Sequence, residues 1–274
     1  MPPGEADAGR FVQCTSCRKT LFSADFEHEL RVCRFCGHHH RLSARDRIAF
    51  TFDEGSFEET DSGLRTVDVL KFPDYMPKHE QAVTKTGMND SVMIGRAKLD
   101  GMPVSAGVAE FGFMGGSMGV VAGEKVTRCL ERGAEEGMPV IMVCASGGAR
   151  MQEGLSSLVQ MAKTTVAVER CREAGVPFIA VMTDPTMAGV LASYASVADV
   201  ILAEPKAMIG FAGARVSKQA QVVKAPSDFQ TAEWVNKSGM VDRIVERRDM
   251  RGTLIALVRA LGAHLRTSNA LAGA

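Results

Sequence analysis

Two closely spaced cysteine pairs constrain the fold of this chain more than any other feature. Cys14 and Cys17 form the first Cys-x2-Cys pair, and Cys33 and Cys36 form the second after a spacer of fifteen residues. This spacing is typical of a four-thiolate zinc site, because each pair can supply two of four tetrahedral ligands about 2.3 Å from the metal. A segment this short has almost no core, so we expect the metal to supply its folding energy.

The predicted metal site is structural rather than catalytic. Sulfur at all four ligand positions closes the site and leaves no position for water. His38, His39 and His40 follow the second pair and would allow a Cys3His ligand set. Four available cysteines favour the all-thiolate set, so we expect these three histidines to be solvated surface residues.

The cysteine count and the opening residues indicate the compartment. The chain has seven cysteines, its opening residues form no signal peptide, and no apolar run approaches the roughly 20 residues of a membrane span. Thiols without an export signal favour a reducing compartment and metal ligation over disulfides. We expect a cytoplasmic protein with no membrane partner. Three further cysteines are predicted to be core thiols rather than nucleophiles: Cys129, Cys144 and Cys171.

The formal net charge of zero conceals an uneven distribution. Residues 10–47 carry eight Lys or Arg against four acids, so the rest of the chain has four excess negative charges. This basic segment could bind nucleic acid or phosphate. A solvated face, or an interface with an acidic partner, is the simpler interpretation. The basic side chains concerned are Arg18, Lys19, Arg31, Arg34, Arg41, Arg45 and Arg47.

Composition and periodicity predict an α/β fold. A hydrophobic fraction of 46% with 23% charged residues is typical of a globular chain. Residues 91–109 are predicted to form a β-hairpin, and from residue 139 short apolar runs alternate with longer amphipathic stretches. This alternation predicts parallel strands joined by helices. The predicted organisation is a disordered N-terminus (1–10), a zinc ribbon (11–42), a helical connector (43–90), the main α/β domain (91–266) and a frayed tail (267–274).

Three glycine clusters follow apolar stretches and are candidate ligand loops. None has the spacing of a phosphate-binding or dinucleotide-binding loop. Gly147 and Gly148 connect a predicted strand to a helix expected to begin near Met151. Main-chain N–H groups and the helix dipole favour negative charge at such a position and could stabilise a thioester enolate. A tight strand-to-helix turn without a ligand is the alternative. No histidine lies near these glycines in sequence, which disfavours a Ser-His-Asp hydrolase.

The cysteine pairs and the glycine clusters together resemble a known family. Residues 145–153 have the sequence ASGGARMQE, residues 183–186 have TDPT, and residues 203–207 have AEPKA. With the cysteine pairs, these motifs resemble the β subunit of bacterial acetyl-CoA carboxylase carboxyltransferase, from about Phe11 to about Leu261. The resemblance implies a crotonase-like fold, which is a superhelix of ββα units, with an N-terminal four-cysteine zinc ribbon.

The resemblance also implies an activity and partners. The expected reaction transfers the carboxyl group of carboxybiotin, supplied on a separate biotin carboxyl carrier protein, to acetyl-CoA, giving malonyl-CoA for fatty acid synthesis. Expected partners are a carboxyltransferase α subunit in an α2β2 heterotetramer and biotin carboxylase. The chain contains neither an A-M-K-M biotinylation motif nor an ATP-grasp glycine loop, so we expect biotin and ATP use to belong to other subunits.

The resemblance implies roles for individual residues. The N–H groups of Gly147 and Gly148 are expected to stabilise the thioester oxyanion, while the partner holds the biotin oxygen. Arg150 is expected to orient its loop or to meet the partner at the substrate site. Four further glycines are expected to shape the channel for CoA: Gly115, Gly116, Gly210 and Gly213.

Departures from the family pattern leave the acyl-group preference open. Ala188 and Leu191 replace a glycine and a small residue, and Ala214 replaces a proline. Ala188 adopts positive φ less readily than glycine, so the turn there could shift. Two other readings stay open: a biotin-independent malonyl-thioester decarboxylase subunit, and a zinc-ribbon nucleic-acid-binding regulatory protein.

Overall fold

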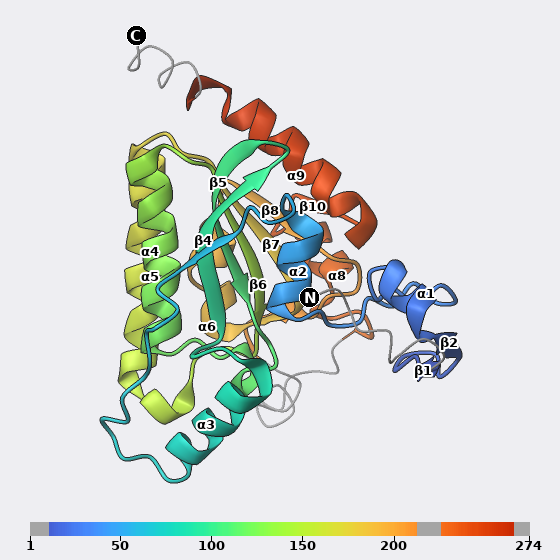
Figure 1. Cartoon of the computed structure of the whole chain (residues 1–274), viewed down its shortest axis with the longest axis horizontal. Helices are drawn as coiled ribbons and strands as arrows, with labels where there is room; N and C mark the ends of the chain where they lie inside the picture. Colours follow the sequence, from blue (N-terminus) through green and yellow to red (C-terminus); the bar gives the residue numbers. More distant parts are fainter. Residues whose placement is uncertain (1–10, 213–225, 266–274) are drawn as a thin grey trace.

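The computed structural model describes residues 11–212 and 226–265. Figure 1 shows a large α/β body with a small module at one side. Four predictions concern residues outside the described part of the chain: the disordered start (1–10), the frayed tail (267–274), and the roles of Gly213 and Ala214.

The small module contains the four cysteines. Strands β1 (Phe11–Gln13) and β2 (Thr20–Phe22) pair in antiparallel register, and helix α1 (Ser23–His28) follows. Its apolar core consists of little more than Leu21, Phe26 and the cysteines themselves. We call residues 11–40 the ribbon. Such a small core agrees with the expectation that a metal contributes to folding.

A mixed eight-stranded sheet forms the centre of the body. Its order is β10-β8-β7-β6-β5-β4-β3, and β9 pairs with β7 beyond the end of β8. The pairs β3–β4 and β4–β5 are antiparallel, and all other pairs in the sheet are parallel. The strands are β3 (Glu58–Thr60), β4 (Val92–Leu99), β5 (Met102–Ala109), β6 (Val140–Ser146), β7 (Phe178–Met187), β8 (Val200–Ala203), β9 (Ile209–Gly210) and β10 (Arg243–Ile244).

Helices cover both faces of this sheet (Figure 1). Helices α4 and α5 lie side by side on one face, and α2 and α9 lie on the other. Helix α3 lies beside the carboxyl ends of the central strands. The helices are α2 (Ala44–Thr51), α3 (Tyr75–Thr86), α4 (Val120–Glu136), α5 (Leu155–Glu173), α6 (Ala188–Leu191), α8 (Ala232–Lys237) and α9 (Arg247–Leu261).

Alternation along the buried strands creates two cores. In β6, Met142 and Cys144 pack with the α4–α5 layer, whereas Ile141 and Val143 pack with the α2–α9 layer. All seven residues of β6 are buried, as expected for a central parallel strand covered on both faces. The apolar run beginning at Pro139 is therefore explained by a strand that helices cover on both faces of the sheet.

The predicted hairpin and the alternating elements after residue 139 are present. Two differences concern the candidate site. Sequence reasoning did not predict α4, and the helix expected to begin near Met151 begins at Leu155, after a 3-10 turn at Met151–Glu153. No helix in the described part of the chain has the length and apolar character required to cross a membrane.

Candidate functional site

The four cysteines of the ribbon converge on one point. Their Sγ atoms all lie within 4.8 Å of one another. Cys14 and Cys36 have Sγ atoms 3.8 Å apart, and so do Cys17 and Cys33. Four sulfurs placed tetrahedrally around a metal at about 2.3 Å would be separated by about 3.8 Å. The donor set therefore fits a tetrahedral metal ion.

Both cysteine pairs are built on the same tight turn. The N–H of Arg18 donates to the carbonyl of Cys14 at 3.0 Å, and the N–H of Gly37 donates to that of Cys33 at 2.7 Å. Arg18 and Gly37 occupy equivalent positions with φ of 62° and 65°. The turns bring each pair of thiols together, and the closed ligand set agrees with a structural role.

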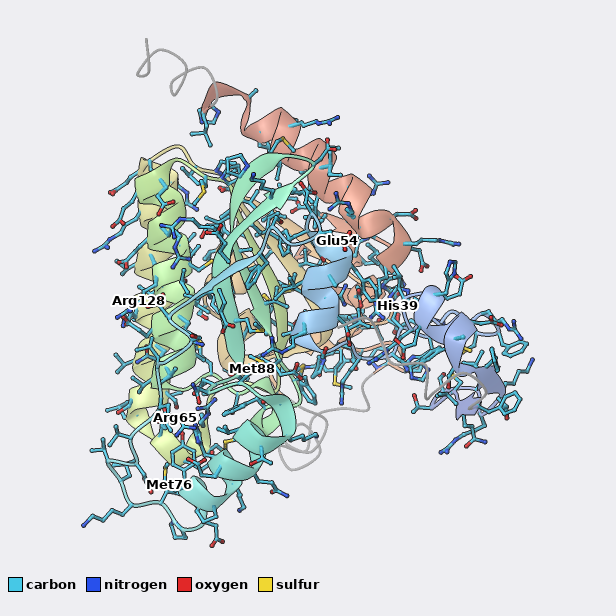
Figure 2. All side chains as sticks on the ribbon, in the orientation of Figure 1. His39, Glu54, Arg65, Met76, Met88 and Arg128 are labelled. Atoms are coloured by element: carbon cyan, nitrogen blue, oxygen red, sulfur yellow. The ribbon has the colours of Figure 1, made fainter. Side chains whose placement is uncertain are left out.

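The expectation that all three histidines are solvated is wrong for His39. Its side chain is buried, and its Nε2 lies 2.8 Å from a carboxylate oxygen of Glu246. Figure 2 shows His39 where the ribbon meets the body. His40 also faces inward, with its Nε2 3.4 Å from the Sγ of Cys14. Packing of the ribbon against the body buries side chains that an isolated ribbon would expose.

A buried ionic cluster joins the ribbon to the body. Glu204 forms an ion pair with Arg47 at 2.7 Å and accepts hydrogen bonds from the Nε and Nη2 of Arg247 at 2.8 and 2.6 Å. Arg247 also donates to the carbonyls of Leu30 and His40 at 2.8 Å each. We call Glu204, Arg47, Arg247 and His39 the Glu204 cluster. Burial alone would raise the pKa of Glu204, but Arg47 and then Arg247 and His39 outweigh it and hold that pKa well below its ordinary value.

Several charges of the basic segment are paired within the protein. Arg31 pairs with Glu27 and Asp46, and Arg34 pairs with Asp25. Together with buried Arg47, these pairs reduce the charge that the segment can offer to nucleic acid. The observation supports the simpler interpretation of the segment as a partly neutralised surface.

Two glycine loops lie side by side at the carboxyl end of β6. We call residues 113–119 the first glycine loop and residues 146–150 the second glycine loop. Met118 and Ala149 form a parallel bridge, and the N–H of Met118 donates to the carbonyl of Gly148 at 2.9 Å. Gly116 lies so close to the end of β6 that a Cβ there would be 2.0 Å from the carbonyl oxygen of Ala145. The structure thus brings together Gly115, Gly116, Gly147 and Gly148.

The position of Gly148 admits only glycine. Its φ is 121°, and a Cβ there would lie 2.7 Å from the Cβ of Ala188. Ala188 itself has φ of 47°, so the alanine accepts a left-handed conformation. Ala188 therefore has positive φ in spite of its Cβ, and its methyl group is directed at the second glycine loop.

The two expected oxyanion donors already have acceptors inside the protein. The N–H of Gly147 donates to the carbonyl of Gly115 at 2.8 Å, and that of Gly148 donates to the Oγ of Ser146 at 3.0 Å. The expected helix N-terminus is also displaced, because α5 begins at Leu155. A thioester oxygen would have to share or replace these bonds, and the dipole of α5 does not act directly at Gly148.

Arg150 does not line an open site. Its side chain has no exposed surface, and its guanidinium forms a twofold ion pair with Asp90 at 2.7 and 2.8 Å. It also donates to the Oγ and the carbonyl of Ser117 in the first glycine loop. The contacts contradict direct substrate binding or partner contact by this side chain and support the alternative that it orients the loops.

Gly210 lies at the same end of the sheet, on the far side of β7. It pairs with Met187 through β9, next to the turn at Ala188. A Cβ at Gly210 would be 2.4 Å from the side-chain amide of Gln230, so a larger residue would require Gln230 to move. Gly210 lies near the second glycine loop, and its expected role in the CoA channel stays a prediction.

Sequence reasoning missed a basic groove beside the first glycine loop. The groove has a volume of about 580 Å³. Lys78 and Lys85 project from one face of α3, where a spacing of seven residues was the available signal. Arg41 and Gly115 also line the groove; the guanidinium of Arg41 lies 3.9 Å from the ring centre of Phe111 and 3.4 Å from a carboxylate oxygen of Asp184. The groove offers three cations next to a glycine-rich backbone, an arrangement suited to phosphates.

Neither the remaining cysteines nor Ser117 provides a nucleophile. Cys129, Cys144 and Cys171 are fully buried, as predicted, and burial raises their pKa values to about 11, 12 and 12. Ser117 lies in a Gly-x-Ser-x-Gly sequence, but its Oγ accepts a hydrogen bond from Arg150. Activation of a serine requires a base in hydrogen-bond reach, and the described residues place no histidine there.

A mixed α/β domain with glycine loops at the strand ends defines the class of this protein. Residues 38–266 match the family model of the carboxyl transferase domain. A relative in Citrifermentans bemidjiense is 47% identical, and the alignment covers 92% of this chain and 91% of the relative. A relative in Synechococcus sp. WH7803 is 46% identical, and the alignment covers 95% of this chain and 90% of the relative. Both are named acetyl-coenzyme A carboxylase carboxyl transferase subunit beta. The chain belongs to this family of transferase subunits.

Solved structures agree with this assignment and with the crotonase-like fold class. A chain of transcarboxylase 12S superposes with a TM-score of 0.67 at 25% identity, covering 86% of this chain and 42% of that one. A chain of the Pseudomonas malonate decarboxylase hetero-dimer superposes with a TM-score of 0.62 at 25% identity, covering 78% and 85%.

Proposed function

We propose that this chain performs the carboxyltransferase half-reaction of acetyl-CoA carboxylase with a partner subunit, converting acetyl-CoA to malonyl-CoA. The observation that carries the proposal is the pair of glycine loops beside a basic groove, in a chain 47% identical to named β subunits. The arrangement offers main-chain N–H groups for an acyl oxyanion next to cations for the phosphates of CoA. In the proposed assembly, biotin arrives on a biotin carboxyl carrier protein charged by biotin carboxylase.

The proposed mechanism requires no acid or base from this chain. Carboxybiotin, when bound, supplies carbon dioxide by cleavage of its N–C bond, and the freed ureido nitrogen takes the proton lost from the acetyl methyl group. The residues of this chain hold the thioester so that its α carbon faces the carbon dioxide. The N–H groups of Gly147 and Gly148, released from Gly115 and Ser146, stabilise the enolate oxygen. The mechanism therefore requires no histidine as a base at the glycine loops.

The basic groove is the proposed binding place for the CoA phosphates. Lys78 and Lys85 on α3 and Arg41 at the ribbon boundary surround it. Lys78→Ala with Lys85→Ala should raise KM for malonyl-CoA about tenfold and leave kcat within about twofold, because phosphate contacts contribute uniform binding. Lys237→Ala, at an exposed amine 3.5 Å from Asp228 outside the groove, is the control for each single variant, Lys78→Ala and Lys85→Ala. Loss of kcat with unchanged KM would contradict this placement.

We infer that the metal of the ribbon is one structural zinc ion. The four thiolates, their 3.8 Å separations and the two matching turns support this inference. Metal analysis of the purified full chain should give close to one zinc per chain. A protein with an intact ribbon and a different metal, or none, would contradict it.

We infer that the partner subunit docks on an apolar stripe along α5. Leu155, Leu158, Val159 and Val166 lie on one face of the helix and are 51–72% exposed. The matched part of the transcarboxylase 12S chain is only 42% of that chain, so more than half of its length remains for further units. The stripe begins next to the second glycine loop, where a partner would reach the proposed site. Continuous apolar surface of this kind is typical of subunit interfaces.

The docking proposal is tested by co-purification with the carboxyltransferase α subunit. Leu158→Glu should abolish the complex, because a carboxylate would be buried without a partner. Met240→Glu, which changes an apolar side chain of similar exposure outside the stripe, should leave the complex intact. Normal assembly of Leu158→Glu would contradict docking on α5.

The activity is tested by the reverse reaction. The purified chain mixed with the α subunit should convert malonyl-CoA and biocytin to acetyl-CoA and carboxybiocytin. Absence of this activity in a folded, zinc-loaded pair would refute the proposed function. The structural similarity to the malonate decarboxylase hetero-dimer supports a second candidate, decarboxylation of a malonyl thioester. Equal release of carbon dioxide with and without biocytin would favour that candidate.

A further inference from the structure

Arg150 joins the two glycine loops from inside the protein. It belongs to the second glycine loop, two residues after Gly148, and its Nη2 and Nε donate to the carbonyl and Oγ of Ser117 at 2.8 and 3.2 Å. Asp90, also without exposed surface, binds both ends of the guanidinium. Ser91 adds a hydrogen bond from its Oγ to the same carbonyl of Ser117 at 2.9 Å. The distance between the loops is thus set by a buried ion pair.

A second carboxylate continues this network toward the connector. Glu153 accepts from the Oγ of Thr66 at 2.8 Å and, very closely, from the hydroxyl of Tyr75. It also accepts from the N–H of Val120, the first residue of α4, which follows the first glycine loop. Burial, and then the hydrogen bond to Glu153, raises the pKa of Tyr75 to about 12, so its hydroxyl remains a donor at neutral pH. Two polar anchors, Asp90 and Glu153, therefore face Arg150.

We propose that Asp90, Tyr75 and Glu153 are positioning residues that act through Arg150 to hold the two glycine loops at the separation needed for oxyanion stabilisation. None of them lines the basic groove, and all three side chains are buried; Tyr75 and Glu153 line a separate cavity of about 190 Å³. Tyr75 and Asp90 lie 75 and 60 residues before Arg150, outside the 145–153 motif, whereas Glu153 is the last residue of that motif. The inference rests on the proposed function, because it concerns the same N–H groups.

The proposed role predicts a specific kinetic signature. The N–H of Gly147 is bonded to Gly115 of the first glycine loop, so a change in loop separation alters the direction of that N–H. Misplacement of an oxyanion donor affects the transition state more than the bound substrate. Variants in the network should therefore lower kcat and leave KM for malonyl-CoA nearly unchanged.

The test uses the full chain assembled with its α subunit and two mild variants. Tyr75→Phe removes one hydroxyl and keeps the ring, and Ser117→Ala removes the acceptor of the Nε of Arg150. Each should lower kcat about three- to tenfold with KM within about twofold. The double variant should lose less than the product of the two single losses, because both act through one guanidinium. Asp90→Asn should cause the largest fall, and the mild variants decide the outcome where it fails to fold.

Ser105→Ala is the matched control. Its Oγ donates to the carbonyl of Cys129 at 2.7 Å, in an equally buried position at the opposite end of the sheet. This variant should lose a similar amount of thermal stability with unchanged kcat. Equal kcat losses in Ser105→Ala and Tyr75→Phe, a parallel rise of KM, or fully multiplicative losses would overturn the positioning role.

A readout independent of activity separates this inference from the proposed function. Amide hydrogen exchange at Gly147 and Gly148 should accelerate at least threefold in Tyr75→Phe and Ser117→Ala, and not in Ser105→Ala. Inactive wild-type protein would refute the proposed function alone. Unchanged exchange in both network variants would refute the positioning role whatever the activity.

Discussion

The ribbon and the glycine loops are held by the same device with different consequences. At the ribbon, Arg247 pairs with buried Glu204 and donates to the carbonyls of Leu30 and His40. At the glycine loops, Arg150 pairs with buried Asp90 and donates to the carbonyl of Ser117. In both places a guanidinium joins a buried carboxylate to the backbone of a neighbouring segment.

The difference lies in what else supports each region. The ribbon has a small core and depends on its cysteine ligands and on the Glu204 cluster. The glycine loops extend from fully buried β6 and bridge to each other at Met118 and Ala149. Loss of the buried pair should therefore detach the ribbon as a module, whereas at the loops it should change geometry and leave the body folded.

The largest expected effect is at the metal ligands of the ribbon. Cys33→Ser should remove the bound metal and unfold the ribbon, since metal binding to small zinc modules contributes about 10 kcal/mol or more. Metal content and limited proteolysis of the full chain measure this loss. Cys171→Ser, a matched change of a buried thiol in α5, should retain the metal. Full metal content in Cys33→Ser would contradict the site.

The second effect concerns attachment of the ribbon. Glu204→Gln leaves Arg47 and Arg247 without a buried counter-charge, which should lower the free energy of unfolding by about 3–5 kcal/mol. Denaturant unfolding at pH 7 measures this loss. Glu131→Gln, which breaks the exposed pair with Arg170, should change it by at most about 1 kcal/mol. Equal effects of the two substitutions would show that the Glu204 cluster does not hold the ribbon.

The pH dependence of the free energy of unfolding also tests the Glu204 cluster, because the low pKa of Glu204 fixes the direction of the change. The pKa of Glu204 is well below 4.5 in the folded chain, so on acidification the unfolded chain binds this proton first. The stabilisation is fully present above about pH 4.5 and is lost as the pH falls toward the folded pKa. The Glu204→Gln variant has no carboxylate to protonate at this position, so its free energy of unfolding should fall less steeply than that of the wild type below pH 4.5. Parallel curves would contradict the low pKa.

The sequence could predict features that depend on residues close together in the chain, but not contacts between residues far apart in the chain. The cysteine site rests on two local turns, and the clustering of its four cysteines, the hairpin and the alternating strands were correctly predicted from short patterns. The contacts that support these elements join distant residues. Arg150 and Asp90 are 60 residues apart, and His39 and Glu246 are 207 apart. No periodic or spaced pattern connects such pairs.

Helix α4 illustrates a second limit. Gly123 and Gly133 interrupt its sequence and lower its helix propensity. The structure uses both for close packing, since a Cβ would lie 2.5 Å from the amide of Gln160 at Gly123 and 2.1 Å from Val140 at Gly133. Tertiary contact with α5 and β6 therefore compensates for the low helix propensity of the two glycines.

The third effect is at the glycine loops and should leave folding largely intact. Gly148→Val places a β-branched side chain against Ala188 at a φ of 121°, so the second glycine loop must move. We expect kcat to fall about 100-fold or more with KM for malonyl-CoA within about threefold. Gly239→Val is the matched control, because Gly239 also has positive φ, at 75°, but has open space around it. Equal losses of kcat and of CoA affinity would identify a binding turn instead.

The smallest expected effect has the opposite sign. Ala188 has φ of 47°, a conformation that costs a residue with a Cβ about 1 kcal/mol relative to glycine. Ala188→Gly should therefore raise the free energy of unfolding by about 0.5 kcal/mol, after the greater entropy of the unfolded glycine chain is deducted. Ala192→Gly, at the end of the same helix with an ordinary φ of −77°, should lower it by a similar amount. Urea midpoints measure both. If both variants are destabilised equally, the methyl group of Ala188 contributes more through its contact with the second glycine loop than its backbone conformation costs.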